Sequence, residues 1–234
     1  MSHLLSKSKY IRGLQCERAL WLDVHEPRQA RYSAEQMRRF DRGRNFEYTF
    51  KAQFPDGIDI SAELKRNADL YPERTAELLD LRSVTAAQIV LFEAGFQYDD
   101  VLVLADVVCQ REDGSLDIYE VKSGITLSDT YRRDAALQYY VISHCRSIHS
   151  FNIVYNGADG LNRVNEQDGR LAIVDLTAEL AAEGEHIAAN IAEMKTIVRA
   201  TAEPETPTGQ HCLTPYECPY QHHCQQGVRQ LTLF

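Results

Sequence analysis

The sequence predicts an α/β fold in which a small mixed β-sheet is flanked by helices. Three consecutive runs rich in β-branched and aromatic residues, 88–96, 101–110 and 116–124, are typical of strands. Amphipathic helical patterns lie on both sides of these runs, at 33–54 and 128–145. Elements mixed in this way pack as layers, and a hydrophobic content of 44% is enough for a core.

The N-terminal part is expected to be helical. Residues 6–22 have the pattern of a single helix with Ser6 as its cap. Ser33 and Gln36 form a capping-box pattern that opens a second helix, 33–54. The apolar positions of this second helix repeat at helical spacing and are expected to face the core: Met37, Phe40, Phe50 and Phe54.

The runs 101–110 and 116–124 flank a hairpin signal with Asp-Gly near its centre. If residues 112–114 form a three-residue loop with Gly114 in the left-handed conformation, Asp106 lies opposite Glu120. A two-residue type I′ turn is the alternative, and it would shift the register by one residue. The first register brings two carboxylates together.

Directly paired side chains have Cβ atoms about 4.5–5.5 Å apart. Buried carboxylates at that distance repel, and a divalent cation between Asp106 and Glu120 would remove the repulsion. Lys122 follows Glu120 by two residues, so a strand places both side chains on one face. The sequence therefore predicts a metal site at Asp106 and Glu120 with an amine beside it.

Glu47 is a further acidic candidate, because it lies seven residues from both Phe40 and Phe54 and should point with them toward the core. A carboxylate there needs a partner. Two interpretations stay open: a salt bridge with an arginine, or a third acidic member of the Asp106 site. Glu93, within 88–96, competes for the second role.

The second half continues with alternating elements. Ser128 and Asp129 start the helix over 128–145, strand patterns follow at 150–157 and 170–177, and one long helix is expected over 177–200. Segment 203–209, with two prolines, is a linker toward the C-terminal cysteines. One face of the helix over 128–145 carries Tyr131, Ala135, Gln138 and Ile142.

The six cysteines are unevenly placed. Cys212, Cys218 and Cys224 fall within the last 23 residues, whereas Cys16 lies far upstream. In an intracellular chain such clustering points to a metal site rather than to disulfides. Cys109 and Cys145 are interpreted as small core residues.

The formal charge of −9 argues at first sight against a nucleic-acid partner. The charge is uneven, however: residues 1–66 carry 13 Lys/Arg and 9 Asp/Glu, a net +4, which leaves −13 for the remainder. No run approaches the ~18 apolar residues of a membrane span, and no apolar signal segment opens the chain, so a cytoplasmic location is expected. Four arginines could form a phosphate-binding face or only a solvated one: Arg38, Arg39, Arg42 and Arg44.

The order Asp106, Glu120-Val121-Lys122 and Gln138 resembles that of the RecB branch of the PD-(D/E)XK nuclease superfamily. One upstream cysteine and three C-terminal cysteines resemble the iron–sulfur arrangement of AddB-type and CRISPR-associated exonucleases in that branch: Cys16, Cys212, Cys218 and Cys224. The hairpin motif alone is weak, and its combination with the split cysteine pattern is much more specific. The resemblance covers nearly the whole chain.

The resemblance implies a restriction-endonuclease-like core and a metal-dependent DNA exonuclease acting on single-stranded ends. Asp106 and Glu120 would hold Mg²⁺ or Mn²⁺, with Glu47 as the first acidic ligand of the family pattern. Lys122 would position or deprotonate the attacking water, and Gln138 would orient the substrate or the Glu120 end of the site.

The chain departs from the family at two points. The tyrosine that often follows the glutamine by four positions is Ile142 here, so Tyr131, Tyr139 or Tyr140 must take its place. The last cysteine spacings are also longer than in many relatives.

Four thiolates fit a [4Fe–4S] cluster, and zinc is the alternative because four cysteines suit it equally. Either group would join the chain ends into a single domain over 1–227, with a core at 33–200 and terminal segments at 1–32 and 201–227.

The remaining residues, 228–234, form a peptide tail. Its final five resemble the bacterial sliding-clamp-binding motif, with anchors that would fill pockets on the clamp. Docking of the tail on its own domain is the alternative. The expected contact residues are Gln230, Leu231, Leu233 and Phe234.

Two other functions stay open. The chain could be a catalytically silent nucleic-acid-binding module, or one subunit of a larger helicase–nuclease complex, since no P-loop is present in the sequence.

Overall fold

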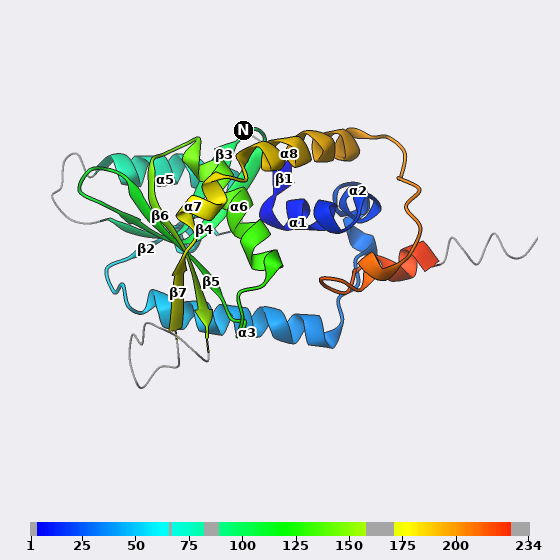
Figure 1. The fold of residues 1–234 in the computed structure, drawn as a ribbon, viewed down its shortest axis with the longest axis horizontal. Coiled ribbons are helices and arrows are strands. Elements are labelled where there is room, and N and C mark those ends of the chain that lie inside the picture. The colour runs from blue at the N-terminus through cyan, green and yellow to red at the C-terminus, as the bar shows by residue number, and fades with distance from the viewer. Residues whose placement is uncertain (1–3, 66, 82–88, 158–170, 226–234) are drawn as a thin grey trace, which may run out of the picture.

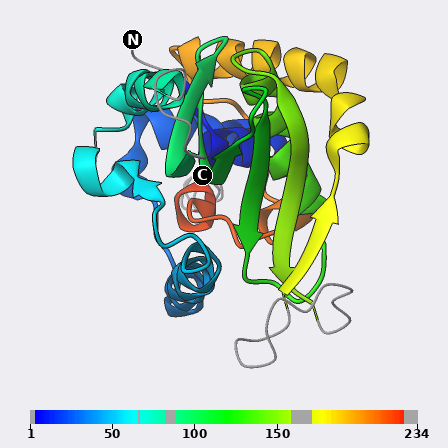
Figure 2. The ribbon, with the colours of Figure 1, turned by 90° about the vertical axis from the view of Figure 1, so that its left-hand side faces the viewer.

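The computed structural model describes residues 4–65, 67–81, 89–157 and 171–225. Within these ranges, seven strands form one mixed sheet in the order β2-β3-β4-β5-β6-β7, and β1 pairs with β4 (Figures 1 and 2). Pairing is parallel for β1 with β4, β2 with β3 and β5 with β6, and antiparallel elsewhere. The strands are β1 (Leu5–Ser6), β2 (Ile58–Asp59), β3 (Val90–Tyr98), β4 (Val101–Gln110), β5 (Leu116–Lys122), β6 (Ile148–Asn156) and β7 (Leu171–Asp175).

Helices flank the sheet, as the sequence predicts (Figure 1). A large core cluster includes Leu137 of α6, Ile191 of α8 and Val108 of β4. A second, smaller cluster places Phe50 of α3 against Val107 and Val121 of the sheet. The helices are α1 (Lys7–Gln15), α2 (Glu17–His25), α3 (Ala34–Lys51), α4 (Ile60–Leu64), α5 (Tyr71–Asp80), α6 (Asp129–Ser143), α7 (Thr177–Ala181) and α8 (Gly184–Arg199).

The hairpin between β4 and β5 has the three-residue loop predicted from the sequence. Gly114 has a φ of +83°, and the Arg111 N–H donates to the Ser115 carbonyl oxygen at 2.9 Å. The ladder pairs Gln110 with Leu116 and Val107 with Tyr119. This register, rather than that of a type I′ turn, directs Asp106 and Glu120 toward each other.

Two helices predicted as continuous are broken in the structure. The helix expected over 6–22 divides at Cys16, whose extended backbone (φ −167°) ends α1 and begins α2. The helix expected over 177–200 divides between α7 and α8, near residue 183. The Ser6 cap and the Ser33 capping box are present as predicted. Helical periodicity continues across such breaks, so it does not reveal them.

The predicted apolar stripe of α3 is only half correct. Phe50 is buried against the sheet, but Met37 and Phe40 are exposed. The N-terminal half of α3 extends past the edge of the core, and α3 ends at Lys51 rather than at residue 54. The exposed Phe40 ring on this half is therefore free to face a cleft.

Three elements have no counterpart in the sequence predictions: β1, β2 and α5. The two strands are only two residues long, too short to give a periodic pattern.

Among the described residues, the helices are all too short or too polar to cross a membrane.

Candidate active site and cysteine cluster

The site forms where β4 and β5 separate. Their ladder stops at the pair Val107 and Tyr119, and Asp106 and Glu120 are the next residues on each strand. Beyond this point the Asp106 side chain takes the place of a ladder bond: its Oδ2 accepts the Val121 N–H at 2.6 Å. Both carboxylates are buried, and Glu120 is only 1% exposed.

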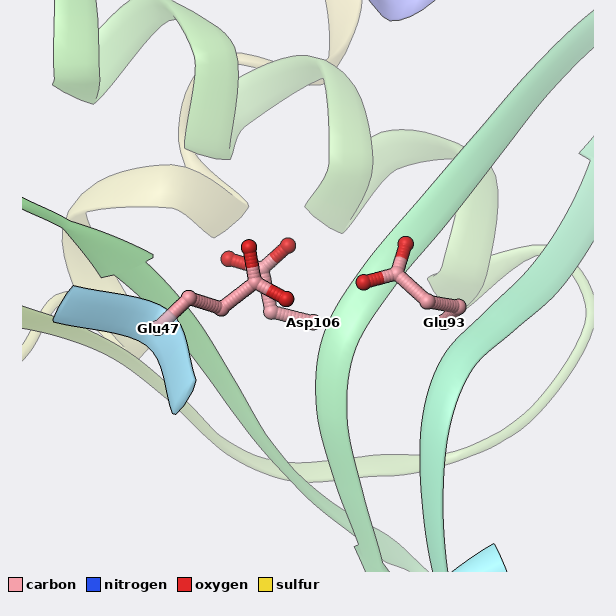
Figure 3. Close-up of side chains that lie close together, drawn as sticks. All are labelled: Glu47, Glu93 and Asp106. Carbon is pink, nitrogen blue, oxygen red and sulfur yellow. The ribbon is translucent and has the colours of Figure 1, made fainter. Parts of the chain in front are cut away.

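Three carboxylates from three elements converge at this opening (Figure 3). Glu47 of α3, Glu93 of β3 and Asp106 of β4 each offer an oxygen within 4.8 Å of the other two. They are the one such group of three or more metal-ligand side chains within the described parts of the chain. Glu93 adopts a φ of 54°, which a non-glycine residue rarely takes and which often occurs at functional sites.

The two candidates for the third acidic position, Glu47 and Glu93, are thus both present. Lys51, one turn after Glu47, bridges them: its Nζ contacts Glu47 and donates to Glu93 Oε1 at 2.7 Å. The sequence interpretation that paired Glu47 with an arginine is wrong, because the cation comes from Lys51 of the same helix. One ammonium shared between two carboxylates leaves the group acidic.

The electrostatics of the group favour a cation. Burial raises the pKa of Glu93 to about 7, with Lys51 opposing and Glu47 adding to the shift. Burial also raises the pKa of Asp106 well above its usual range, and the charge of Glu120 raises it further. Both shifts measure how poorly these positions tolerate negative charge without a metal ion or a proton.

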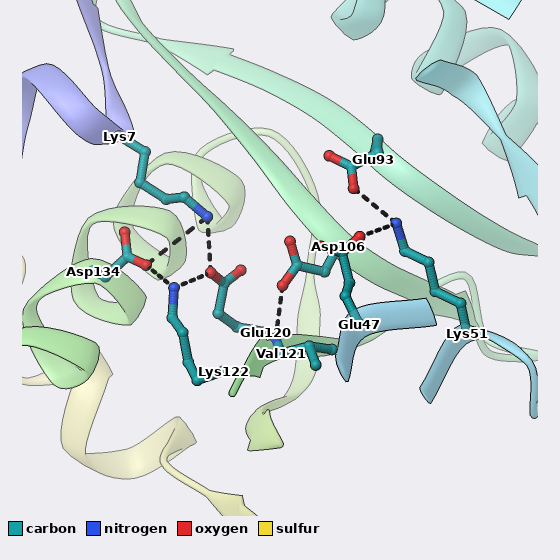
Figure 4. Close-up of polar contacts among 9 residues, drawn as sticks. All are labelled: Lys7, Glu47, Lys51, Glu93, Asp106, Glu120, Val121, Lys122 and Asp134. Carbon is teal, nitrogen blue, oxygen red and sulfur yellow. Dashed lines mark hydrogen bonds and ion pairs between the residues drawn. The ribbon is translucent and has the colours of Figure 1, made fainter. Parts of the chain in front are cut away.

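Glu120 belongs to a neighbouring network rather than to the three-carboxylate group (Figure 4). Its Oε1 accepts from Lys7 Nζ at 2.7 Å and from Lys122 Nζ at 2.5 Å. Asp134 of α6 completes the network through Lys122 and, at 3.8 Å, through Lys7. Burial alone would raise the pKa of Glu120, but the two ammonium groups outweigh it and hold that pKa well below its usual range.

Several buried polar atoms in the network have no hydrogen-bond partner: Glu120 Oε2, Asp134 Oδ1 and both amide atoms of Gln138. Gln138 lies on α6 one turn after Asp134 and is fully buried. Native proteins leave few buried polar groups unpaired, and unpaired ones mark sites for water, ions or substrate. Gln138 is thus on the predicted helix, with a buried amide that has no hydrogen-bond partner.

A cleft of about 810 Å³ opens over both groups. Its lining includes Asp106, Glu120 and Lys122 at one end, and α3 along one side. Of the predicted basic face, Arg39, Arg42 and Arg44 line the cleft, whereas Arg38 pairs with Glu35 outside it.

Of the three tyrosines considered as substitutes at the Ile142 position, Tyr131 lines the cleft. Its ring lies 5.6 Å from Lys122 Nζ. Tyr139 packs on Phe151, and Tyr140 packs on Tyr98, both away from the cleft lining.

Cys16, Cys212, Cys218 and Cys224 gather at the end of α1. Cys212 and Cys218 are buried in a small cluster with Leu22 and Tyr220, and Cys16 packs against it. Burial raises the pKa of the Cys224 thiol to about 11, and the charges of Cys218, Cys16 and Cys212 contribute while Arg18 opposes. Cysteines that are far apart in the sequence thus lie near one another in the structure.

The distances between these thiols differ for the two groups that they could bind, a zinc ion or an iron–sulfur cluster. Tetrahedral zinc with Zn–S bonds of about 2.3 Å brings its sulfurs within about 4 Å of one another. Within the described residues, no three cysteine sulfurs lie within 4.8 Å of one another. A four-iron cluster keeps its thiolates farther apart, because the irons lie between them. Cys109 is a core residue, and Cys145 is half-buried beside the core, away from this cluster.

Three charged residues of the site escaped sequence reasoning: Lys7, Lys51 and Asp134. Lys51 and Asp134 each lie one helical turn from a predicted residue, Glu47 and Gln138, so helical spacing could have found them. Lys7 is 113 positions from Glu120, and no local pattern connects them. The predicted tail contacts Gln230, Leu231, Leu233 and Phe234 lie outside the described residues.

Comparisons with known proteins do not identify a family for this chain. No family model matches the chain, and no curated protein matches it. One solved structure that matches, titled "Crystal structure of SSO0001", is 10% identical over 86% of this chain and 78% of that chain, with a TM-score of 0.34. A similarity of that size supports no conclusion about the activity of this chain.

Proposed function

We propose that this protein is a Mg²⁺- or Mn²⁺-dependent deoxyribonuclease of the PD-(D/E)XK type that hydrolyses phosphodiester bonds at single-stranded DNA ends. The observation that carries the proposal is the convergence of Glu47, Glu93 and Asp106, of which Glu47 and Asp106 line the same cleft as the Glu120–Lys122 pair. Oxygen-only ligands suit hard divalent cations. The fold proposed to hold this site is restriction-endonuclease-like.

Glu47, Glu93 and Asp106 would hold the ion, and Glu120 would join them once its lysine contacts rearrange. The bound ion would supply Lewis-acid polarisation of a phosphoryl oxygen and a more acidic water. Burial would lower the pKa of Lys122, but Asp134 and Glu120 outweigh it and raise it. Lys122 therefore stays protonated, which favours charge stabilisation at the phosphate over proton abstraction.

Phosphate binding would come from the arginine side of the cleft, formed by Arg39, Arg42 and Arg44. Guanidinium groups bind phosphate oxygens in a bidentate manner, and they position a strand without reading its sequence. The overall negative charge is compatible with this role because α3 itself is net positive, with five Lys/Arg and three Asp/Glu.

The four terminal cysteines are proposed to hold a [4Fe–4S] cluster, with zinc as the alternative; the grouping of Cys16, Cys212 and Cys218 around Leu22 and Tyr220 supports a shared site. Cluster binding would fix the junction of α1 and α2 to segment 212–224 and so act as a structural staple. Binding of the sliding clamp by residues 230–234 stays a prediction, as does a cytoplasmic location.

The function is tested with an end-labelled single strand incubated with Mn²⁺, with Mg²⁺ or with EDTA. We expect metal-dependent degradation that Glu120→Gln reduces by about 100-fold or more, because the carboxylate that faces Lys122 is lost. Glu193→Gln is the matched control: Glu193 also precedes a lysine by two residues, in Glu193-Met194-Lys195, but is exposed on α8. Binding of the strand without cleavage in the presence of Mn²⁺ would instead identify a silent nucleic-acid-binding module.

Metal affinity should rise with pH. The proton on Glu93, whose pKa is about 7 in the metal-free protein, competes with the ion for the same oxygens. Between about pH 8 and about pH 6, Mn²⁺ affinity is expected to fall by about tenfold, measured by titration calorimetry. The same raised pKa means that protonated Glu93 stabilises the metal-free fold below its unfolded pKa of about 4.5, a contribution lost as pH rises through 7. Glu93→Gln should flatten the pH dependence of binding, and an unchanged slope in this variant would remove Glu93 from the ligand set.

A further inference from the structure

Aromatic rings line the cleft beside the acidic group: Tyr32, Phe40, Tyr131 and Tyr216. Three of them are substantially exposed, with fractions of 45% for Tyr32, 49% for Phe40 and 38% for Tyr216. Large apolar rings gathered in a concave, basic site are typical of ligand binding, whereas single exposed rings on convex surfaces need no explanation.

The three exposed rings, Tyr32, Phe40 and Tyr216, come from two segments of the cleft lining, whereas Tyr131 lies on α6. Tyr32 and Phe40 form an edge-to-face pair at the start of α3, with centroids 5.8 Å apart and planes at 70°. Tyr216 belongs to the loop between Cys212 and Cys218. Its carbonyl oxygen accepts from Gln15 Nε2 at 2.6 Å, and the neighbouring Glu217 carbonyl accepts from Gln36 Nε2 at 2.8 Å. Both α1 and α3 thus fix the position of the second segment.

Cations alternate with these rings along α3. Arg39 and Arg42 flank Phe40 in sequence and line the same cleft. Arg42 shares Glu35 with Arg38, so its charge is only partly neutralised. A helix that offers guanidinium groups and an exposed ring side by side matches a ligand that alternates phosphates and planar apolar groups.

A single nucleic-acid strand has that chemistry, and a duplex does not. In a duplex the π-faces of the bases are covered by their neighbours, so protein rings cannot stack on them without unpairing. Phe40 precedes Glu47 by seven residues, which is about 10 Å along a helix, or about three nucleotides at a rise of 3.4 Å. The spacing allows one strand to reach the acidic group while its bases contact Phe40.

We infer that Phe40 and Tyr216 form two stacking surfaces for the unpaired bases of a DNA strand whose phosphate enters the acidic group. The inference rests on the proposed function and adds the reason for a single-stranded substrate. Tyr32 supports the Phe40 ring from its edge, and Arg39 and Arg42 hold the phosphates between stacked bases.

The test measures equilibrium binding by fluorescence anisotropy in EDTA, where cleavage does not occur. Two labelled strands of about 12 nucleotides are compared, one with normal bases and one abasic through its central positions. The wild-type protein should bind the abasic strand about 10- to 100-fold more weakly, because stacking is lost while the phosphates remain. In Phe40→Ala and Tyr216→Ala, affinity for the normal strand should fall and the difference between the two strands should shrink.

Control variants separate stacking from general damage. Tyr48→Ala removes a ring that lies on the same helix, is 69% exposed and is absent from the cleft lining, so its binding should equal that of wild type. Phe40→Trp keeps an aromatic face and should retain the preference for the normal strand. Thermal unfolding should be unchanged in Phe40→Ala because the ring is exposed.

Wild-type protein that binds both strands equally, or that binds a blunt duplex as tightly as the normal strand, would overturn the inference. So would a Phe40→Ala variant that keeps the full difference between the two strands. These results do not depend on catalysis. If cleavage is absent but binding depends on the bases, only the proposed function is contradicted. If cleavage occurs but binding does not depend on the bases, only the stacking inference is contradicted.

Discussion

Replacing Asp106 with asparagine is expected to abolish Mn²⁺-dependent DNA cleavage, with a loss of about a thousandfold or more. Asp106 connects the two halves of the site: it belongs to the three-carboxylate group, and the charge of Glu120 acts on it. Asparagine keeps the size and the acceptor for the Val121 N–H but removes the charge that would bind the ion. Initial rates on a labelled single strand measure the effect.

The same variant should be more stable than wild type when metal is absent. Burial and the charge of Glu120 raise the pKa of Asp106, which shows that an ionised carboxylate is disfavoured at this position, and asparagine removes that ionisable group. Removing a charge kept for function commonly stabilises a protein by about 0.5–2 kcal/mol. Thermal unfolding in EDTA should show a midpoint higher by about 2–6 °C. An Asp106→Asn variant that is inactive but more stable would show that the Asp106 charge serves function and lowers stability. Full cleavage by this variant would exclude this site as the source of activity.

Replacing Cys212 with serine is expected to have the second largest effect. The proposed cluster joins residue 16 to residue 212, and a link that closes so long a loop contributes about 3 kcal/mol or more. The midpoint should fall by about 6–12 °C, and absorption at about 400 nm in anaerobically purified protein should disappear. Segment 212–224 should also become more susceptible to proteolysis.

Cys145→Ser is the matched control for this variant. Cys145 is half-buried and its Sγ donates only to the Gln97 carbonyl oxygen, a contact that serine can keep. It should retain both the absorption and the stability. If the wild-type protein contains zinc and no iron, the bound group is zinc rather than an iron–sulfur cluster. If Cys212→Ser leaves the unfolding midpoint unchanged, neither group has a structural role.

The central hairpin shows what the sequence can determine. Its turn residues fix the loop length, and the loop length fixes which residues face each other, so the register around Asp106 and Glu120 follows from local chemistry alone. The strands and the major helices follow from periodicity. The coarse architecture, a mixed sheet between helices, was therefore predictable.

The partners of each charge were less predictable because they depend on tertiary contacts. Glu120 was expected to bind a metal ion together with Asp106. In the structure its carboxylate instead accepts hydrogen bonds from Lys122 and from Lys7, which is far away in the sequence. The choice between Glu47 and Glu93 could not be made from sequence, since both reach the same point from separate elements. Breaks at Cys16 and near residue 183 also leave helical periodicity intact.

Helix α1 has a mechanical consequence for the whole molecule. Lys7 is its first residue, and Cys16 follows its last. Nine residues at 1.5 Å each make a stiff rod about 13 Å long, with a thiol at one end and the Glu120 contact at the other. The helix therefore links the Cys16 end of the chain to the Lys7–Glu120 contact, so a metal bound at the cysteines, as proposed, would be connected mechanically to the proposed phosphate site.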